Sequence, residues 1–172
     1  SDQAIVITNY AYWLASHRYG QGLVQVSRLF CDEAHAVADQ IASACQLRVP
    51  GHEVKGRAPK TIDGWRLWAS QQIVEGATDD RDVIGRLRVR TRRERYETMQ
   101  HRLGKGWAWA QDGDQYLFEP IDVRALTGLL FDHVTHATLL SATVTRHTIE
   151  TLLGLSPSDV TYHQVAMRFP LE

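Results

Sequence analysis

The sequence has few cysteines and no long apolar run, and each absence removes a class of protein. Its 172 residues include two cysteines, Cys31 and Cys45, too few for a disulfide-stapled fold. No apolar stretch approaches the roughly 20 residues that span a bilayer, and no signal peptide is visible. We therefore expect an intracellular protein, of the cytoplasm or nucleoid, with no membrane partner.

Net charge is also nearly absent. A formal charge of −1 gives no overall electrostatic sign of a nucleic-acid-binding protein. The charge is nevertheless uneven along the chain. Between Arg86 and Lys105, eight arginines and lysines stand against two acids, Glu94 and Glu97. This local basic excess is the one electrostatic feature that indicates an anionic partner.

What the sequence does have is a pair of adjacent acids, Asp32 and Glu33, between an apolar run at 29–31 and an alanine-rich helical stretch. Ionised carboxylates avoid dry interiors unless they are paired or bind a metal. At the end of a buried strand, such a pair is typical of nucleotide hydrolysis, where one carboxylate holds magnesium and the other polarises water. The alternative is an acidic helix N-terminus, because acids cap helices and favour the positive end of the helix dipole.

Two further apolar runs, residues 4–7 and 137–140, also end in polar residues. These are Thr8, Asn9 and Tyr10 after the first run, and Ser141, Ala142 and Thr143 after the second. Ligands of open parallel sheets bind at the carboxyl ends of the strands. The three runs together therefore predict one ligand site.

In this order the segments resemble superfamily-2 DNA helicases of the DEAH type. Residues 32–35, Asp-Glu-Ala-His, look like motif II, and residues 141–143, Ser-Ala-Thr, look like motif III. Residues 8–10 look like the stretch between the first DNA-contacting motif and motif II. The Pro-Ile-Asp-Val of 120–123 and the Leu-Gly-Leu of 153–155 are similar to the DinG/XPD branch.

The resemblance covers residues 1–45 and 107–172. Between these two ranges only the place in the chain corresponds to the family, not the residues themselves. Residues 167–170 depart from the pattern, since Met-Arg-Phe-Pro stands where the branch has Ser-Pro-Phe-like residues. The resemblance implies an α/β fold, a partial RecA-like parallel sheet with helices. A helical, arch-like insertion at 46–106 would separate the two segments of this motor core.

The resemblance also implies roles for the motif residues. Asp32 would coordinate Mg²⁺ through water, and Glu33 would be the catalytic base of ATP hydrolysis. His35 would relay the nucleotide state towards motif III. Ser141 and Thr143 would hydrogen-bond to motif II and couple hydrolysis to movement.

DNA, single-stranded or forked, is the implied partner. Thr8, Asn9 and Tyr10 would line its path; alternatively, Asn9 caps the following helix and Tyr10 packs in the core. A set of arginines on one predicted helix would track phosphates, or would form a solvated face paired with nearby acids. They are Arg86, Arg88, Arg90, Arg92, Arg93 and Arg95.

ATP and Mg²⁺ are the implied cofactors, yet the chain has no Gly-x-x-x-x-Gly-Lys-Ser/Thr loop to cradle phosphates. We therefore expect a fragment whose remaining helicase domains supply that loop, and negligible ATPase activity from this chain alone. Two cysteines cannot hold the iron–sulfur cluster of some family members. An apolar sheet edge left by missing strands would favour self-association or a partner chain.

Two other functions stay open. One is a non-enzymatic module, derived from a helicase, that binds single-stranded nucleic acid through the arginines. The other is a hydrolase of another class that uses Asp32, Glu33 and His35 around a metal. His133 and His136 have metal-compatible spacing but lie in a predicted loop, where surface histidines are the commoner outcome.

Apolar periodicity predicts the remaining elements. The expected helices cover 10–16, 34–45, 62–76, 79–103, 122–131 and 145–153. The expected strands cover 4–8, 23–31, 137–140 and 160–165, with turns at 20–22 and 112–114, the latter inside a hairpin. The tryptophans are expected to pack in the core rather than stack on bases; they are Trp65, Trp68, Trp107 and Trp109.

Overall fold

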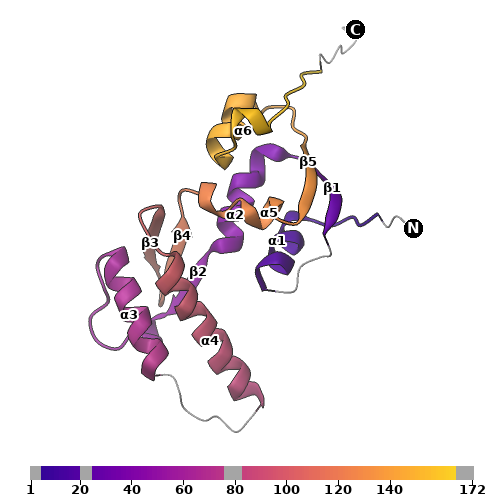
Figure 1. The fold of residues 1–172 in the computed structure, drawn as a ribbon. Coiled ribbons are helices and arrows are strands. Elements are labelled where there is room, and N and C mark those ends of the chain that lie inside the picture. The colour runs from indigo at the N-terminus through magenta and orange to yellow at the C-terminus, as the bar shows by residue number, and fades with distance from the viewer. Residues whose placement is uncertain (1–4, 20–24, 76–82, 166–172) are drawn as a thin grey trace, which may run out of the picture. The chain divides into compact units, whose positions relative to one another are not determined.

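A computed structural model describes residues 5–19, 25–75 and 83–165 (Figure 1). The chain is a mixed α/β protein that forms two compact units. Unit 1 comprises residues 1–41 and 123–172, and unit 2 comprises residues 42–122. Within the described ranges, no helix combines the length and apolar character needed to cross a bilayer.

The described part of unit 1 contains a two-stranded parallel sheet. Strand β1 (Val26–Cys31) pairs with β5 (Val134–Leu139), and Cys31 lies opposite Leu139 (Figure 1). Both strands were predicted, although β5 begins before residue 137. Because the strands are parallel, the segments that follow Cys31 and Leu139 leave the sheet at the same edge.

Strand β1 is not the buried strand that the apolar run predicted. Only Cys31 is buried along it, whereas the Phe30 side chain is 65% exposed. Among the described strands, β1 pairs with β5 alone, so the sheet is narrow. The acids that follow it are consequently at the surface.

The helices of unit 1 largely follow the prediction. They are α1 (Tyr10–Tyr19), η1 (Ala34–Ala36), α2 (Val37–Cys45), which continues into unit 2, η3 (Arg124–Leu126), α5 (Gly128–Phe131), α6 (Arg146–Leu153) and η4 (Pro157–Asp159). Helix α6 is capped at both ends. The Thr145 hydroxyl accepts the Thr148 N–H, and Gly154 ends the helix in the left-handed region at φ 64°.

Several predictions for this unit are wrong. The segment 5–8 is not a strand, and its Ile5 and Ile7 side chains are 90% and 94% exposed. No described strand pairs with it, so its β-branched residues have no sheet to join. Residues 160–165 are likewise not a strand, and 161–165 are exposed. The helix expected over 122–131 is two short pieces. Ala4, the turn at 20–22 and residues 167–170 lie outside the described residues.

Unit 2 combines two helices with a three-stranded antiparallel sheet. The helices are α3 (Ile62–Glu75) and α4 (Val83–Arg102), and the short η2 covers Gly51–Glu53. The strands are β2 (Leu47–Pro50), β3 (Trp107–Asp112) and β4 (Gln115–Pro120), in the order β2-β4-β3. The predicted hairpin is confirmed, and Gly113 takes the positive φ of 59° that its turn requires.

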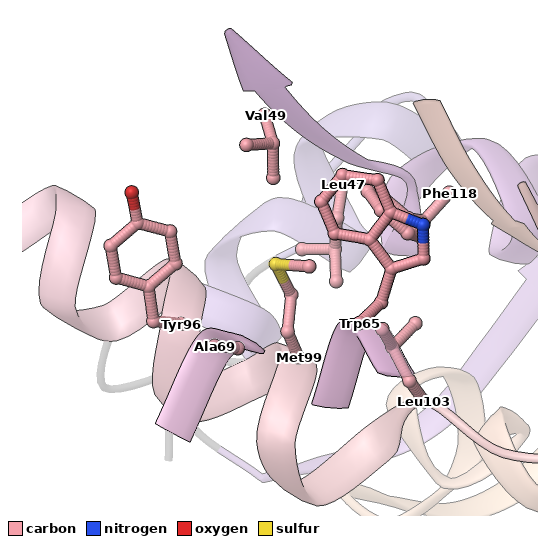
Figure 2. Packing of buried hydrophobic residues seen from close by; sticks show 8 residues of the cluster. All are labelled: Leu47, Val49, Trp65, Ala69, Tyr96, Met99, Leu103 and Phe118. Carbon is pink, nitrogen blue, oxygen red and sulfur yellow. The ribbon is translucent and has the colours of Figure 1, made fainter. Parts of the chain in front are cut away.

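The core of unit 2 is built around Trp65, which is fully buried (Figure 2). Its ring meets those of Trp68, Trp109 and Phe118 edge-on, with centroids 5.0–5.7 Å apart. Such edge-to-face pairs add to the stabilisation from burial. The prediction that the tryptophans pack rather than stack on bases is confirmed for this core, against which Trp107 also packs.

The limits of unit 2 differ from the expected insertion. Residues 46–106 were expected to be helical, yet the hairpin from the following segment shares the core of α3 and α4 through Trp109 and Phe118. Strand β2 was missed because its alternation of buried and exposed residues is too short to recognise. Only Leu47 and Val49 point inward before Pro50 ends the strand. Both residues are nevertheless buried, at 6% and 0% exposure.

Candidate functional site

The polar segments after β1 and β5 meet at the edge where these strands end. Leu140 donates its backbone N–H to the Cys31 carbonyl at 2.8 Å, and Ala34 donates its own to the Leu140 carbonyl at 2.8 Å. These two bonds continue the strand pairing beyond the sheet itself. The acids at 32–33 are therefore fixed beside the hydroxyl residues 141–143, as the sequence predicted.

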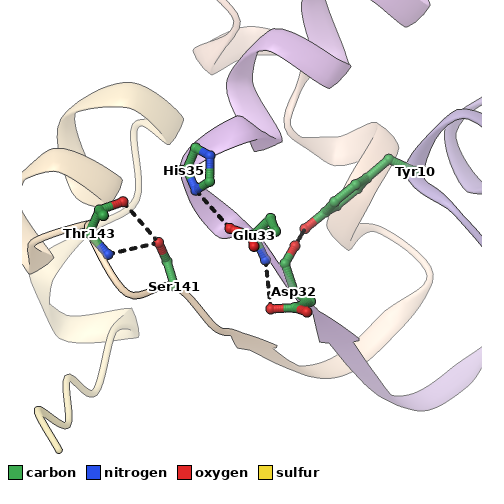
Figure 3. Close-up of polar contacts among 6 residues, drawn as sticks. All are labelled: Tyr10, Asp32, Glu33, His35, Ser141 and Thr143. Carbon is green, nitrogen blue, oxygen red and sulfur yellow. Dashed lines mark hydrogen bonds and ion pairs between the residues drawn. The ribbon is translucent and has the colours of Figure 1, made fainter. Parts of the chain in front are cut away.

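The acid pair has an unusual backbone. Glu33 adopts φ 51° and ψ 46°, the left-handed region, and no other non-glycine residue in the described ranges has a positive φ. A side chain in that region costs about 1–2 kcal/mol. The Asp32 Oδ1 atom accepts the Glu33 N–H at 2.9 Å (Figure 3). Backbone strain of this kind concentrates at functional sites.

His35 is brought to the acid pair. Its Nδ1 lies 3.1 Å from Glu33 Oε2, and both side chains are more than half exposed. The alternative prediction, that the acids stand at a helix N-terminus, is borne out in position. Glu33 is the N-cap residue of η1, yet its side chain makes no capping hydrogen bond. The carboxylates therefore face solvent at the sheet edge, where a ligand can reach them.

The hydroxyls after β5 do not make the bonds predicted for them. Ser141 Oγ accepts the Thr143 N–H at 3.2 Å and lies 3.4 Å from the Thr143 hydroxyl. Among the described residues, neither hydroxyl bonds to a side chain of the segment 32–35. The link between the two segments is made by the backbone, and the side chains remain available to another group.

Of the three residues expected on a DNA path, Tyr10 instead contacts the acid pair. Its hydroxyl donates a 2.6 Å hydrogen bond to the Asp32 carbonyl. Burial, followed by interaction with Cys31 and the two neighbouring acids, raises the pKa of the Tyr10 phenol. Asn9 caps α1, since its Oδ1 accepts the Tyr12 N–H at 2.8 Å. This is the alternative that the sequence offered for Asn9, and the Tyr10 contact was not predicted, because 22 residues separate the partners.

Cysteines and histidines contribute no evident metal centre. Cys31 and Cys45 are buried and not disulfide-bonded, and burial raises the pKa of the Cys31 thiol. His133 stacks on His17 with ring centroids 4.6 Å apart. His136 lies in β5, not in the predicted loop. Over the part of the chain that the structure describes, no three metal-binding side chains cluster.

Two of the arginines proposed to track phosphates pair along helix α4. Arg90 lies 2.7 Å from Glu94, and Arg93 lies 2.8 Å from Glu97. These are exposed pairs one helical turn apart, of the kind that contributes only a few tenths of a kcal/mol. The guanidinium groups therefore stay accessible at the surface.

Arg92 and Arg95 have a different role. Both approach Glu53, at 3.4 and 3.3 Å, and the Glu53 side chain is only 9% exposed. Arg95 also donates to the Arg48 carbonyl at 2.8 Å. These two arginines hold α4 against the segment after β2. Glu53 was missed in the sequence because it lies in a predicted loop, 39 or more positions before its partners.

Arg86 and Arg88 are exposed, and within the described ranges neither has an acidic partner. They place two exposed positive charges near the start of helix α4. No protein-family model matches the chain, and no curated protein sequence is significantly similar to it. The features of this chain that indicate a function are therefore the geometry of the strand ends and the charges of α4.

Proposed function

We propose that this chain is the part of the first motor domain of an ATP-dependent DNA helicase that carries motifs II and III, of the DinG/XPD type. Motif II is Asp32–His35 and motif III is Ser141–Thr143. Unit 2 occupies the position of the arch-like insertion between them. The nucleotide loop and the second motor domain belong to the remaining helicase domains.

The observation that carries this proposal is the backbone link between Ala34 and Leu140, 2.8 Å long, at the parallel ends of β1 and β5. A parallel pair brings both polar segments to one edge, which is where open α/β sheets bind ligands. A chance occurrence of the letters Asp-Glu-Ala-His would not require a parallel strand that ends in hydroxyl residues beside it. The spatial pairing therefore supports the motif assignment independently of the sequence pattern.

The donor groups suit the chemistry. Asp32 and Glu33 are exposed carboxylates, and hard oxygen donors are what Mg²⁺ prefers. When bound, Mg²⁺–ATP supplies an electrophilic phosphorus. Asp32 would hold the hydrated metal, Glu33 would accept the proton of the attacking water, and the imidazole of His35 would orient the Glu33 carboxylate.

Exposed apolar side chains support the expectation that other domains cover this unit. Ile5, Ile7 and Phe30 are between 65% and 94% exposed, and Leu140 is 47% exposed. Large apolar side chains left exposed in this number are a feature of proteins that have a contact surface for a partner. The missing motor strands, or a second copy of the chain, would bury them.

The test is the flanking coding sequence together with the activity of its full product. We expect an upstream Gly-x-x-x-x-Gly-Lys-Ser/Thr segment and DNA-stimulated ATP hydrolysis. Glu33→Gln should lower kcat at least about a hundredfold, as loss of a catalytic base does. Glu97→Gln, which removes a surface carboxylate from unit 2, should leave it unchanged. A product with no phosphate loop, or full activity in Glu33→Gln, would refute the proposal.

The second candidate is a non-enzymatic module that binds single-stranded nucleic acid. Arg86 and Arg88 favour it, because they are exposed cations with no described acidic partner. The 172-residue chain alone would then bind single-stranded DNA with a salt-dependent affinity. Replacing both arginines by glutamate should abolish that binding, whereas Lys55→Glu, a charge reversal at an exposed site of unit 2 outside α4, should weaken it far less.

A further inference from the structure

The backbone of Glu33 is held by hydrogen bonds to both of its flanking peptide groups. The preceding peptide group joins Asp32 and Glu33. Its carbonyl accepts the Tyr10 hydroxyl at 2.6 Å, and its N–H donates to Asp32 Oδ1 at 2.9 Å (Figure 3). Both ends of this peptide group are therefore occupied, which fixes the plane on which the φ angle of Glu33 depends.

The following peptide group, between Glu33 and Ala34, is held in the same way. Its carbonyl accepts the Ala36 N–H at 2.9 Å, and its N–H donates to the Leu140 carbonyl at 2.8 Å. Four bonds thus oppose the steric cost of the left-handed conformation. Three of them come from the local chain or from the end of β5. The fourth comes from a side chain on another helix, α1.

We propose that Tyr10 is a positioning residue for Glu33, and that it links α1 to the acid pair through the Asp32 carbonyl. The proposal rests on the proposed function, in which Glu33 is the catalytic base. Tyr10 touches neither nucleotide nor water itself. The Tyr10 hydroxyl fixes the peptide plane before Glu33. The Glu33 carboxylate therefore points in a different direction from the one that a right-handed backbone would give it.

This arrangement changes the interpretation of the segment 8–10. The Tyr10 hydroxyl is committed to Asp32, and the amide oxygen of Asn9 is committed to the Tyr12 N–H. Thr8 lies in the exposed stretch that leads directly into α1. Any ligand that repositions residues 5–9 would therefore move Tyr10, and through it the peptide group that sets Glu33.

The experiment compares Tyr10→Phe with Tyr12→Phe in the isolated chain. Tyr12 is a matched control because it lies on the same helix, is 57% exposed and has no hydroxyl partner among the described residues. In Tyr10→Phe, we expect the Glu33 Cα and Cβ chemical shifts to move away from left-handed values. The Glu33 amide should exchange roughly fivefold faster, which corresponds to one lost hydrogen bond. Tyr12→Phe should change neither, and the Met99 amide in unit 2 should be unaffected.

A merely structural tyrosine would lower the melting temperature and leave the Glu33 shifts in place, and that result would overturn the proposal. In the full gene product, Tyr10→Phe should lower kcat several-fold with little change in KM for ATP, because the base is misplaced while binding is retained. The two proposals fail separately. If the Glu33 shifts respond while Glu33→Gln retains ATPase activity, the helicase assignment fails and the positioning contact stands.

Discussion

The Tyr96 hydroxyl donates a 2.6 Å hydrogen bond to Glu53 Oε2, across 43 positions of sequence. This bond joins helix α4 to the short η2 that follows β2. The same carboxylate also forms ion pairs with two arginines of α4, so one residue of a predicted loop meets three partners from that helix. A nearly buried charge is tolerated only when it is paired in this way.

Removing the Glu53 charge should therefore destabilise unit 2. We expect Glu53→Gln to lower the free energy of unfolding by about 2 kcal/mol or more, because the nearly buried Glu53 is the shared counter-charge of two arginines. Glu94→Gln is the matched control, since Glu94 also pairs with an arginine of α4 but is exposed. It should cost less than about 0.5 kcal/mol in urea unfolding. Equal effects of the two variants would contradict the Glu53 network.

Alkaline pH should weaken the same network. Burial, and then the hydrogen bond to Glu53, raise the pKa of the Tyr96 phenol in the folded state. A group whose folded pKa is raised contributes stability that is complete below its unfolded pKa, about 10, and is lost as the pH rises above it. The free energy of unfolding should thus fall steadily as the pH rises above about 10. The fall should be smaller in Tyr96→Phe than in the wild type, and unchanged in Tyr12→Phe.

Local patterns could be predicted from the sequence, and pairing partners could not. The helix α6 was predicted over 145–153 and is found at Arg146–Leu153, because apolar periodicity and helix-ending residues are encoded within a short stretch of sequence. The strand expected at residues 4–8 was wrong, because apolar, β-branched composition does not say whether a neighbouring strand exists to pair with. Ile5 and Ile7 remain exposed for that reason.

At the candidate site, too, local features could be predicted from the sequence and distant contacts could not. Asp32 and Glu33 could be selected from their position after an apolar run, and the parallel pairing of β1 and β5 bears out their predicted proximity to Ser141. The Tyr10 contact could not be foreseen, because its spacing carries no periodic signal. The left-handed conformation of Glu33 was equally hidden, since glycine or asparagine is the usual marker of that region.

Two residues of helix α3 should respond differently to truncation, because one is buried in the core of unit 2 and the other is exposed. Trp65→Ala should cost about 3–5 kcal/mol, because it leaves a large cavity among the rings of Trp68, Trp109, Tyr116 and Phe118. Leu67→Ala changes a side chain of the same helix that is 62% exposed. It should cost no more than about 0.5 kcal/mol. Amide exchange at Met99 and Phe118, both buried in unit 2, measures the loss of stability in each variant. A large loss in Leu67→Ala would contradict the placement of Leu67 on the exposed face of the helix.

The left-handed backbone of Glu33 should reverse the usual ranking of alanine and glycine. Because a Cβ atom costs about 1–2 kcal/mol in that region, Glu33→Gly should be more stable than Glu33→Ala by about 1 kcal/mol. Both variants lose the contact with His35, so their difference isolates the backbone. At Ala38, within α2, the order should be the ordinary one, and Ala38→Gly should destabilise by about 0.5–1 kcal/mol. Urea unfolding of the variants measures each value, and an alanine advantage at position 33 would show that the four hydrogen bonds do not impose the strained conformation.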